Sequence, residues 1–233
     1  MLNFTFHNST KIIFGKGQIK ALTSEIPEGA KVLMTYGGGS IKTNGIYQQV
    51  CAALEEHEWF EFSGIEPNPK YDTLIKALEI IRVHDIDYLL AVGGGSVIDG
   101  TKFIAAAALY QGEDPWDILA KRHTITEALP LGAVLTLPAT GSESNGGSVV
   151  TRNGNKLAFG NPLVRPTFAV LDPATSLSLS DRQVSNGVVD AFIHTMEQYL
   201  TYPVNGSVQD RFAEGLLLTL IEEGPKALQP DTK

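Results

Sequence analysis

Short apolar runs alternate with amphipathic stretches along most of this chain. The runs at residues 31–36, 58–62, 87–92, 132–137 and 168–172 are rich in β-branched and aromatic side chains and too short for helices, so they predict strands. Between them, residues 46–54 and 71–83 carry apolar side chains at a spacing of three and four, which predicts helices. This alternation predicts a parallel sheet with right-handed crossovers.

The pattern differs at the two ends of the chain. Phe4 and Phe6 alternate with polar neighbours, and residues 11–14 resume the alternation after a polar break, which predicts an N-terminal hairpin. From Ser180 onward two helical patterns follow each other with no strand between them. We therefore expect an α/β, Rossmann-like parallel sheet domain over residues 1–179 and the start of an incomplete all-helical domain over 180–233.

The composition limits which binding partners and which cellular compartment are expected for this chain. The formal net charge is −8 and no run of lysine or arginine occurs, which argues against nucleic acid and against an anionic membrane surface. Cys51 is the one cysteine, so neither a disulfide nor a cysteine metal cage is available, and we expect a cytoplasmic protein. We see neither a signal-peptide pattern nor an apolar stretch long enough to span a membrane.

Two strand-to-helix connections carry the same tetrapeptide, Gly-Gly-Gly-Ser, at residues 37–40 and 93–96. Such a turn leaves backbone N–H groups free at a helix N-terminus with no Cβ in the way, and the serine adds a hydroxyl, so it suits a phosphate. A tight turn without a ligand would need only one glycine. Neither the G-x-G-x-x-G fingerprint nor the nucleoside-triphosphate loop is present, and dinucleotide binding is favoured over phosphoryl transfer.

The first turn indicates which dinucleotide is bound. An acidic residue that accepts hydrogen bonds from the ribose 2′-hydroxyl would repel a 2′-phosphate. The segment 35–45 has no Asp or Glu, and it offers Ser40 and Lys42. We therefore expect NADP(H) rather than NAD(H).

Hydroxyl side chains follow the strand predicted at 132–137. They are Thr136, Thr140, Ser142, Ser144 and Ser148, and in an open α/β sheet ligands bind at this end of the strands. An ordinary polar loop is the alternative. A serine hydrolase is excluded, because the sequence around Ser142 is not the G-x-S-x-G elbow and no His and acid follow in the required order.

Asp190 and His194 are four residues apart in a predicted helix, so they share one face and can ligate one metal ion. Glu197 lies one turn further along. A surface ion pair is the alternative. The other histidines lie in the predicted hairpin, at a helix end and in loops, and none pairs with His194.

Taken together, these motifs resemble the iron-containing (group III) alcohol dehydrogenases, in particular the NADPH-dependent aldehyde reductase and butanol dehydrogenase branch. The resemblance spans essentially the whole chain and is carried by FGKG at 14–17, TYGGGS at 35–40, GIEPNP at 64–69, LLAVGGGSVIDGTKFIA at 89–105, LTLPATGSESN at 135–145, FAVLDP at 168–173 and NGVVDAFIHTMEQY at 186–199. The EPNP and PATGSES segments match this branch better than the related glycerol dehydrogenases and cyclising synthases.

The resemblance implies a role for individual residues. Gly38, Gly39 and Ser40 would face the adenosine 2′-phosphate, Asn68 the adenine side, and Gly94, Gly95 and Ser96 the pyrophosphate. The nicotinamide half would be lined by Asp99, Thr136, Thr140, Asn145 and Lys156. Asp190 and His194 would be the first two ligands of a catalytic divalent metal, Fe²⁺ or Zn²⁺, and the substrates would be short-chain alcohols and aldehydes.

One departure from the family bears on activity. Family members are substantially longer, and their third and fourth metal ligands are histidines on helices that would follow Lys233. We therefore expect this chain to be truncated at its C-terminus. Two functions stay open: an NADP-dependent, metal-containing alcohol dehydrogenase or aldehyde reductase, and a catalytically impaired dinucleotide-binding remnant or interaction module. Association into a homodimer is also left open.

Overall fold

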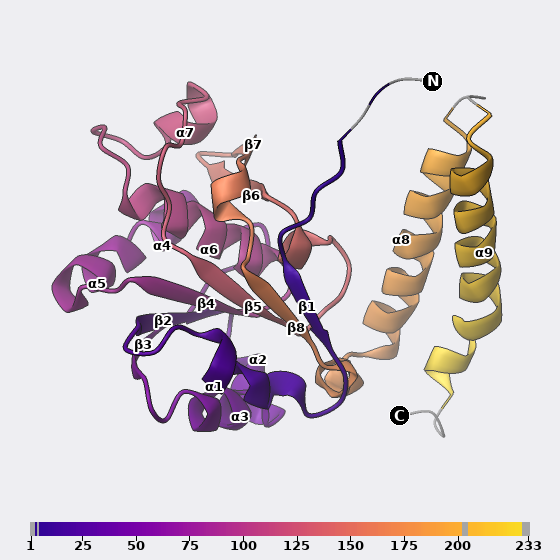
Figure 1. The fold of residues 1–233 in the computed structure, drawn as a ribbon, viewed down its shortest axis with the longest axis horizontal. Coiled ribbons are helices and arrows are strands. Elements are labelled where there is room, and N and C mark those ends of the chain that lie inside the picture. Colours follow the sequence, from indigo (N-terminus) through magenta and orange to yellow (C-terminus); the bar gives the residue numbers. More distant parts are fainter. Residues whose placement is uncertain (1–2, 4, 202–204, 230–233) are drawn as a thin grey trace. The chain divides into compact units, whose positions relative to one another are not determined.

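The computed structural model describes residues 3, 5–201 and 205–229, and it divides into two compact units, residues 1–176 and 177–233 (Figure 1). Unit 1 contains a six-stranded sheet in the order β1-β8-β5-β4-β2-β3, and every pair of neighbours is parallel. Its strands are β1 (Lys11–Phe14), β2 (Lys31–Tyr36), β3 (Glu58–Phe62), β4 (Tyr88–Gly93), β5 (Leu131–Leu135) and β8 (Phe168–Leu171). The predicted parallel sheet is confirmed.

Helices cover both faces of this sheet (Figure 1). One face carries the helices that follow β1 and β2, namely α1 (Leu22–Glu25), α2 (Ser40–Thr43) and α3 (Ile46–Ala53). The other carries α4 (Tyr71–Leu74), α5 (Ala77–His84) and α6 (Gly95–Ala108), and α7 (Asp117–Ala120) lies beyond them. The connection after β2 therefore leaves to one face and the connection after β4 to the other, although β2 and β4 are neighbours.

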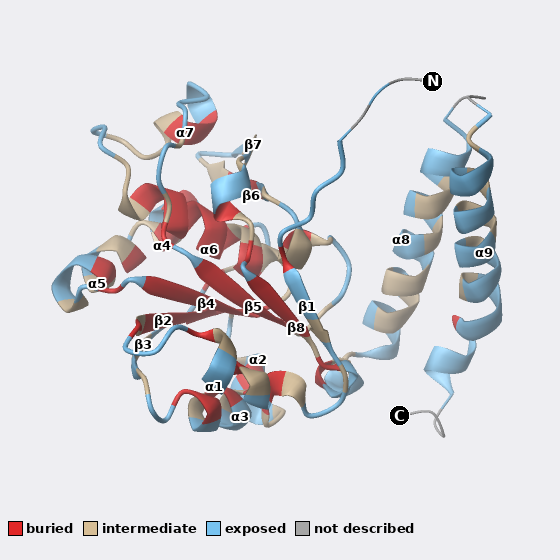
Figure 2. Cartoon of the chain, in the orientation of Figure 1, coloured by how far each residue is buried: buried red, intermediate tan, exposed pale blue. Residues whose placement is uncertain are grey.

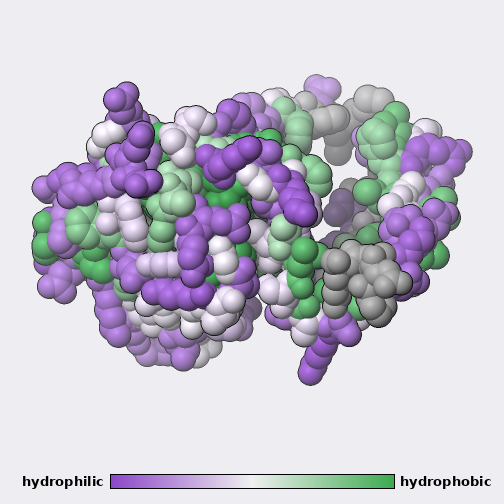
Figure 3. Space-filling view, turned by 90° about the horizontal axis from the view of Figure 1, so that it is seen from below, coloured by the Kyte–Doolittle hydropathy of each residue, from purple (hydrophilic) through white to green (hydrophobic). Residues whose placement is uncertain are grey.

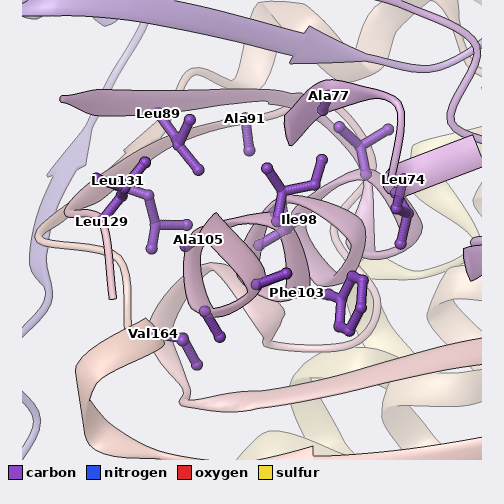
Figure 4. Packing of buried hydrophobic residues seen from close by; sticks show 14 of the residues in the cluster. Leu74, Ala77, Leu89, Ala91, Ile98, Phe103, Ala105, Leu129, Leu131 and Val164 are labelled. Atoms are coloured by element: carbon purple, nitrogen blue, oxygen red, sulfur yellow. The ribbon is translucent and has the colours of Figure 1, made fainter. Parts of the chain in front are cut away.

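The central helix α6 is buried along most of its length. Figure 4 shows Ile98, Phe103 and Ala105 of α6 among Leu89 and Ala91 of β4 and Leu131 of β5. The small residues Ala105, Ala106 and Ala107 are all buried, which lets the helix approach the sheet closely. This packing fixes where α6 begins, at the second glycine turn.

A β-hairpin does occur in the fold, but in the middle of the chain. β6 (Gly147–Arg152) and β7 (Asn155–Gly160) pair antiparallel as a separate two-stranded sheet. Asn153 and Gly154 at its tip both have positive φ, 49° and 77°, as a two-residue hairpin turn of this kind requires. The Asn-Gly pair between two alternating stretches was the sequence signal for this hairpin.

The N-terminal hairpin that we expected is not observed in the described residues. Residues 3 and 5–10 form no strand, and Phe4 lies outside the described residues. β1 instead pairs in parallel with β8, and the side chain of Thr10 hydrogen-bonds Pro166 O at 2.8 Å. The sheet edge therefore already supplies the partner of β1, and Phe6 is left 84% exposed.

Unit 2 is helical, as expected, with α8 (Asp181–Tyr199) and α9 (Ser207–Glu223). Ser180 begins α8 with a capping box, in which Ser180 Oγ accepts from Gln183 N and the Gln183 side chain accepts from Ser180 N. Figure 2 shows no fully buried residue in either helix. Among the described residues, no helix is long and apolar enough to cross a bilayer.

Candidate functional site

The two glycine turns lie next to each other at the carboxyl ends of β2 and β4. Residues 37–40 follow β2, and residues 94–96 follow β4, whose last residue is Gly93. A Cβ placed on Gly37 would lie 3.6 Å from Val97 Cγ2 of α6, so the first turn borders the helix that the second turn opens. Neighbouring strands whose connections leave to opposite faces form the crevice where open α/β sheets bind ligands.

Two glycines of the first turn, Gly38 and Gly39, face open space, whereas a Cβ on Gly37 would lie 3.2 Å from Ile65 O. A Cβ on Gly38 or Gly39 would meet no atom within 4 Å, and only Gly39 needs glycine for its backbone, with φ +98°. Among the described residues, no contact accounts for the missing side chain at Gly38. The space that a Cβ would enter there suits a ligand that approaches the backbone.

The glycines of the second turn are in tight contact with the protein itself. A Cβ on Gly93 would lie 2.6 Å from Val97 Cγ2, and one on Gly95 would lie 2.4 Å from Thr140 Oγ1. A Cβ on Gly94 would lie 3.2 Å from Leu137 Cβ. Packing is therefore enough to account for glycine at 93 and 95, and it brings the hydroxyl segment against the second turn.

A cavity of about 360 Å³ lies beside the second turn. It brings together many of the residues that the sequence assigned to a dinucleotide, namely Asn68, Gly95, Ser96, Asp99, Thr140, Asn145 and Lys156. Pro69, Gly147, Val149, Ala158 and Phe159, which sequence reasoning did not select, complete part of the wall. Gly38, Gly39, Ser40, Gly94 and Thr136 do not line this cavity; Thr136 N donates to Gly93 O at 3.1 Å.

Asn68 connects three elements at the rim of the cavity. Its backbone N–H donates to Ser96 Oγ at 3.3 Å, and its side-chain Oδ1 accepts from Lys156 Nζ at 2.7 Å. Lys156 comes from β7, Ser96 from α6, and Asn68 from the segment before α4. The resemblance assigns Asn68 and Lys156 to different halves of a dinucleotide, and the structure places them in contact.

Asp99 fastens the hydroxyl segment to α6. Its Oδ1 accepts from Ser142 Oγ at 2.6 Å and its Oδ2 from Val149 N at 3.0 Å, while its backbone carbonyl accepts from Ser148 Oγ at 2.8 Å. Burial raises the pKa of the Asp99 carboxyl above its usual value, although the hydrogen bonds from Ser142 and Val149 N and the charge of Lys102 act in the opposite direction. The carboxylate is thus largely used inside the protein.

Lys102 is a polar residue that sequence reasoning missed. It is fully buried on α6, and its Nζ donates to Ser142 Oγ at 2.9 Å, Asn145 Oδ1 at 3.0 Å and Gly147 O at 2.7 Å. Burial lowers its pKa to about 8, against the attraction of Asp99 and Glu143. A lysine three residues after Asp99, directly before the apolar run Phe103–Ala108 of the same helix, was the signal that could have identified it.

An acidic residue does lie near the first turn, on the neighbouring strand β3. The Glu61 carboxylate accepts from Tyr36 Oη at 2.9 Å and Tyr47 Oη at 3.0 Å, and it lies 3.4 Å from Lys42 Nζ. Burial alone would raise the pKa of Glu61, but these three partners hold it below its usual value. Residues 35–45 contain no acidic residue, but the fold brings Glu61 of β3 close to Lys42 of that segment. Because its partners occupy the Glu61 carboxylate, it is poorly placed to accept from a ribose diol.

Asp190 and His194 share a face of α8 as expected, with His194 Nε2 3.5 Å from Asp190 Oδ2. Both side chains are at least half exposed. Among the described residues, no group of three or more His, Cys, Asp or Glu is arranged to hold a metal ion. The pair has the right donor chemistry for a divalent ion, but two donors fall short of the three that a catalytic zinc normally has.

The fold is a doubly wound α/β domain in which the paired glycine turns lie at the carboxyl edge of the sheet, where open sheets of this kind bind ligands. The family model of the iron-containing alcohol dehydrogenases matches residues 9–173. This chain belongs to that family.

The names of proteins similar in sequence are consistent with this family. The chain is 58% identical over 233 residues to the NADPH-dependent aldehyde reductase YqhD of Escherichia coli K12, and 48% identical over 233 residues to the probable NADH-dependent butanol dehydrogenase 1 of Bacillus subtilis 168. Each match covers 98% of this chain and 60% of the relative. The chain thus spans about three fifths of these relatives' length.

Solved structures agree with the fold as well. The substrate- and cofactor-free aldehyde reductase YqhD of E. coli superposes with a TM-score of 0.93 at 55% identity, over 99% of this chain and 60% of that one. NADH-dependent butanol dehydrogenase A of Thermotoga maritima gives 0.88 at 39% identity, over 96% of this chain and 57% of that one.

Proposed function

We propose that this chain binds NADP(H) along the carboxyl edge of its sheet and serves hydride transfer between the nicotinamide and short-chain alcohols or aldehydes. The observation that carries the proposal is the position of the two glycine turns, which end adjacent parallel strands at the point where the connections leave to opposite faces. The open space at Gly38 and the cavity beside α6 give a dinucleotide room on both sides of that point.

In this proposal each glycine turn holds a different part of the dinucleotide. Gly38, Gly39 and Ser40, with Lys42, hold the 2′-phosphate, and Asn68 lies on the adenine side. Gly94, Gly95 and Ser96 hold the pyrophosphate at the N-terminus of α6, a 14-residue helix that no side-chain hydrogen bond caps at this end. The nicotinamide half is lined by Asp99, Thr136, Thr140, Asn145 and Lys156. Bound NADPH supplies the hydride; these side chains orient it and exclude water.

NADP(H) is proposed over NAD(H) because the ammonium of Lys42 stands beside the first turn. Its position above the rings of Tyr36 and Tyr47, 5.1 Å and 4.6 Å from their centroids, keeps the charge at this end of the sheet. E. coli YqhD is named for NADPH and the B. subtilis relative for NADH, so the similarity to these relatives does not by itself decide the cofactor.

Asp190 and His194 are proposed as two ligands of a divalent metal, Fe²⁺ or Zn²⁺. Their carboxylate and imidazole suit such an ion. Two donors do not complete a catalytic centre, so the described residues alone do not account for polarisation of a carbonyl by a metal. We also propose a cytoplasmic location, supported by the single cysteine, and a homodimer, supported by exposed apolar side chains such as Phe212 and Leu216.

The test is a calorimetric titration of the chain with NADPH and NADH, followed by turnover of butanal with NADPH. We expect NADPH to bind more tightly than NADH. We expect turnover to disappear on chelation and to return with Zn²⁺ or Fe²⁺. The absence of NADPH binding would contradict the cofactor assignment, and turnover that is indifferent to chelators would contradict the metal.

A second candidate is favoured by the shortage of metal ligands among the described residues. In this alternative the chain is a dinucleotide-binding remnant or interaction module. Binding of NADPH without turnover, and without stoichiometric metal, would favour this candidate. The same titration therefore separates the two functions.

A further inference from the structure

One buried charge has no part in the proposed chemistry. Lys102 is 0% exposed, on a stretch of α6 whose other buried residues are apolar or small. An ammonium has three N–H donors and cannot accept. All three are used, by Ser142 Oγ, Asn145 Oδ1 and Gly147 O, at 2.9, 3.0 and 2.7 Å.

The three acceptors belong to the segment that walls the cavity. Ser142, Asn145 and Gly147 all line it. Ser142 in turn donates its own proton to Asp99 Oδ1 at 2.6 Å, so a chain of hydrogen bonds runs from Lys102 through Ser142 to Asp99. One side of the cavity is therefore held to α6 by two residues: Lys102 binds Ser142, Asn145 and Gly147, and Asp99 binds Ser142, Ser148 and Val149.

Lys102 also helps to fix which way the amide of Asn145 points, together with Gly147 N and Gly141 O. Asn145 Oδ1 accepts from Lys102 Nζ and, at 2.8 Å, from Gly147 N, and Asn145 Nδ2 donates to Gly141 O at 2.9 Å. Because an ammonium cannot accept, the oxygen must face Lys102. Asn145 Nδ2 makes one hydrogen bond among the described residues, to Gly141 O, and the side chain lines the cavity.

Packing alone does not explain a lysine at this position. Taking a charged group out of water costs several kcal/mol, and a methionine would fill similar space without that cost. Asp99 and Glu143 attract the ammonium, whereas Arg165 repels it. The benefit that offsets burial lies in the three acceptors.

We propose that Lys102 is a positioning residue for the dinucleotide, which holds residues 140–149 in the shape that receives the nicotinamide half. The inference rests on the proposed function. It assigns to Lys102 no contact with the cofactor, and it confines the effect of Lys102 to one half of the bound dinucleotide.

The experiment compares the unaltered chain with Lys102→Met and with Lys121→Met, a control that removes an exposed ammonium paired with Asp117. Calorimetry gives the Kd for NADPH and for 2′,5′-ADP, which carries the adenosine half alone, and thermal unfolding gives Tm. We expect Lys102→Met to raise the Kd for NADPH about tenfold, the effect of one lost charged hydrogen bond. The Kd for 2′,5′-ADP should stay within about twofold, and Lys121→Met should change neither.

Equal weakening of NADPH and 2′,5′-ADP would overturn the proposal, because it would indicate general damage to the sheet domain. Unchanged binding of both would overturn it as well. If Lys102→Met does not fold, Ser142→Ala tests the same chain of hydrogen bonds with no buried charge altered. It should weaken NADPH about threefold and spare 2′,5′-ADP, and the opposite pattern would contradict the proposal.

Failure of the proposed function gives a different result. If the unaltered chain binds no NADPH, the cofactor assignment fails, and hydrogen exchange still tests Lys102 without any cofactor. Lys102→Met should then lower amide protection in residues 141–149 and leave β2 and β4 unchanged. Unchanged protection in that segment would contradict the role of Lys102.

Discussion

The two Gly-Gly-Gly-Ser turns are identical in sequence and opposite in surroundings. In the first, a Cβ on Gly38 or Gly39 would meet nothing within 4 Å; in the second, one on Gly93 or Gly95 would lie within 2.6 Å of another side-chain atom. The second turn thus needs glycine so that the protein can pack on itself. At Gly38 and Gly39 the first turn leaves room that no described residue fills, although a Cβ on Gly37 would lie 3.2 Å from Ile65 O.

The comparison shows that a glycine-rich motif does not by itself indicate what the glycines do. The same four letters satisfy two requirements, close internal packing and access to the backbone. Only the position of neighbouring elements, Val97 and Thr140 at the second turn and open space at the first, tells them apart. Substitution with alanine should therefore give opposite results at the two turns.

The largest effect is expected on stability at the second turn. Gly93→Ala places a methyl group 2.7 Å from Val97 Cβ, on a buried helix that cannot easily move. We expect it to lower the free energy of unfolding by about 3 kcal/mol, as overpacking does. Gly38→Ala, at an ordinary backbone conformation in open space, should leave that free energy within about 0.5 kcal/mol.

Urea denaturation measures both values. Gly39→Ala serves as the backbone control, because its φ of +98° strains any other residue although no atom is near, and we expect a cost of about 1–2 kcal/mol. If Gly38→Ala were as destabilising as Gly93→Ala, the two turns would not differ as the structure indicates.

Much of unit 1 was predictable from local pattern. Strands such as β2 and β3 start and end where short apolar runs do, because each run is long enough to be buried and too short for a helix. The glycine turns were found because a strand, a turn and a helix follow each other directly in the chain. The N-terminal hairpin was wrong because alternation predicts a strand and does not name its partner, which is the distant β8.

The parts of the site that escaped prediction depend on contacts between distant segments. Glu61 reaches Lys42 across the neighbouring strand, and Lys102 reaches Ser142 and Gly147 from a helix. In unit 2 the reverse holds: the face shared by Asp190 and His194 was predictable from their spacing. Figure 3 shows apolar side chains on the surface of the helical pair, and a third metal donor is absent among the described residues.

An intermediate effect is expected on cofactor binding at the first turn. Gly38→Ala places a methyl group where the 2′-phosphate is proposed to approach, so the Kd for NADPH should rise about tenfold, with NADH affected less. Gly215→Ala is the matched control, because that helical glycine also has nothing within 4 Å and lies in α9. Calorimetric titration with both dinucleotides measures the change. If the Kd values for NADPH and NADH rose equally, the methyl group would not lie beside the 2′-phosphate.

The smallest effect is expected at Glu61, which draws on the same Lys42 that the first turn offers to a phosphate. Glu61→Gln removes the carboxylate 3.4 Å from Lys42 Nζ, so we expect NADPH to bind about two- to threefold more tightly, and NADH to be unaffected. The pair is more than a third exposed, so salt near 1 M should abolish the difference.

The Glu61→Gln substitution should also change how stability depends on pH. Because the pKa of Glu61 is lowered by folding, its contribution is present above the unfolded pKa and is lost as pH falls through the folded pKa. Glu61→Gln should remove that part of the acid dependence in urea denaturation below pH 4.5. In the binding experiment, an equal decrease in the Kd for NADPH and for NADH would show that Lys42 does not face the 2′-phosphate. The first turn would then not explain a preference for NADP(H).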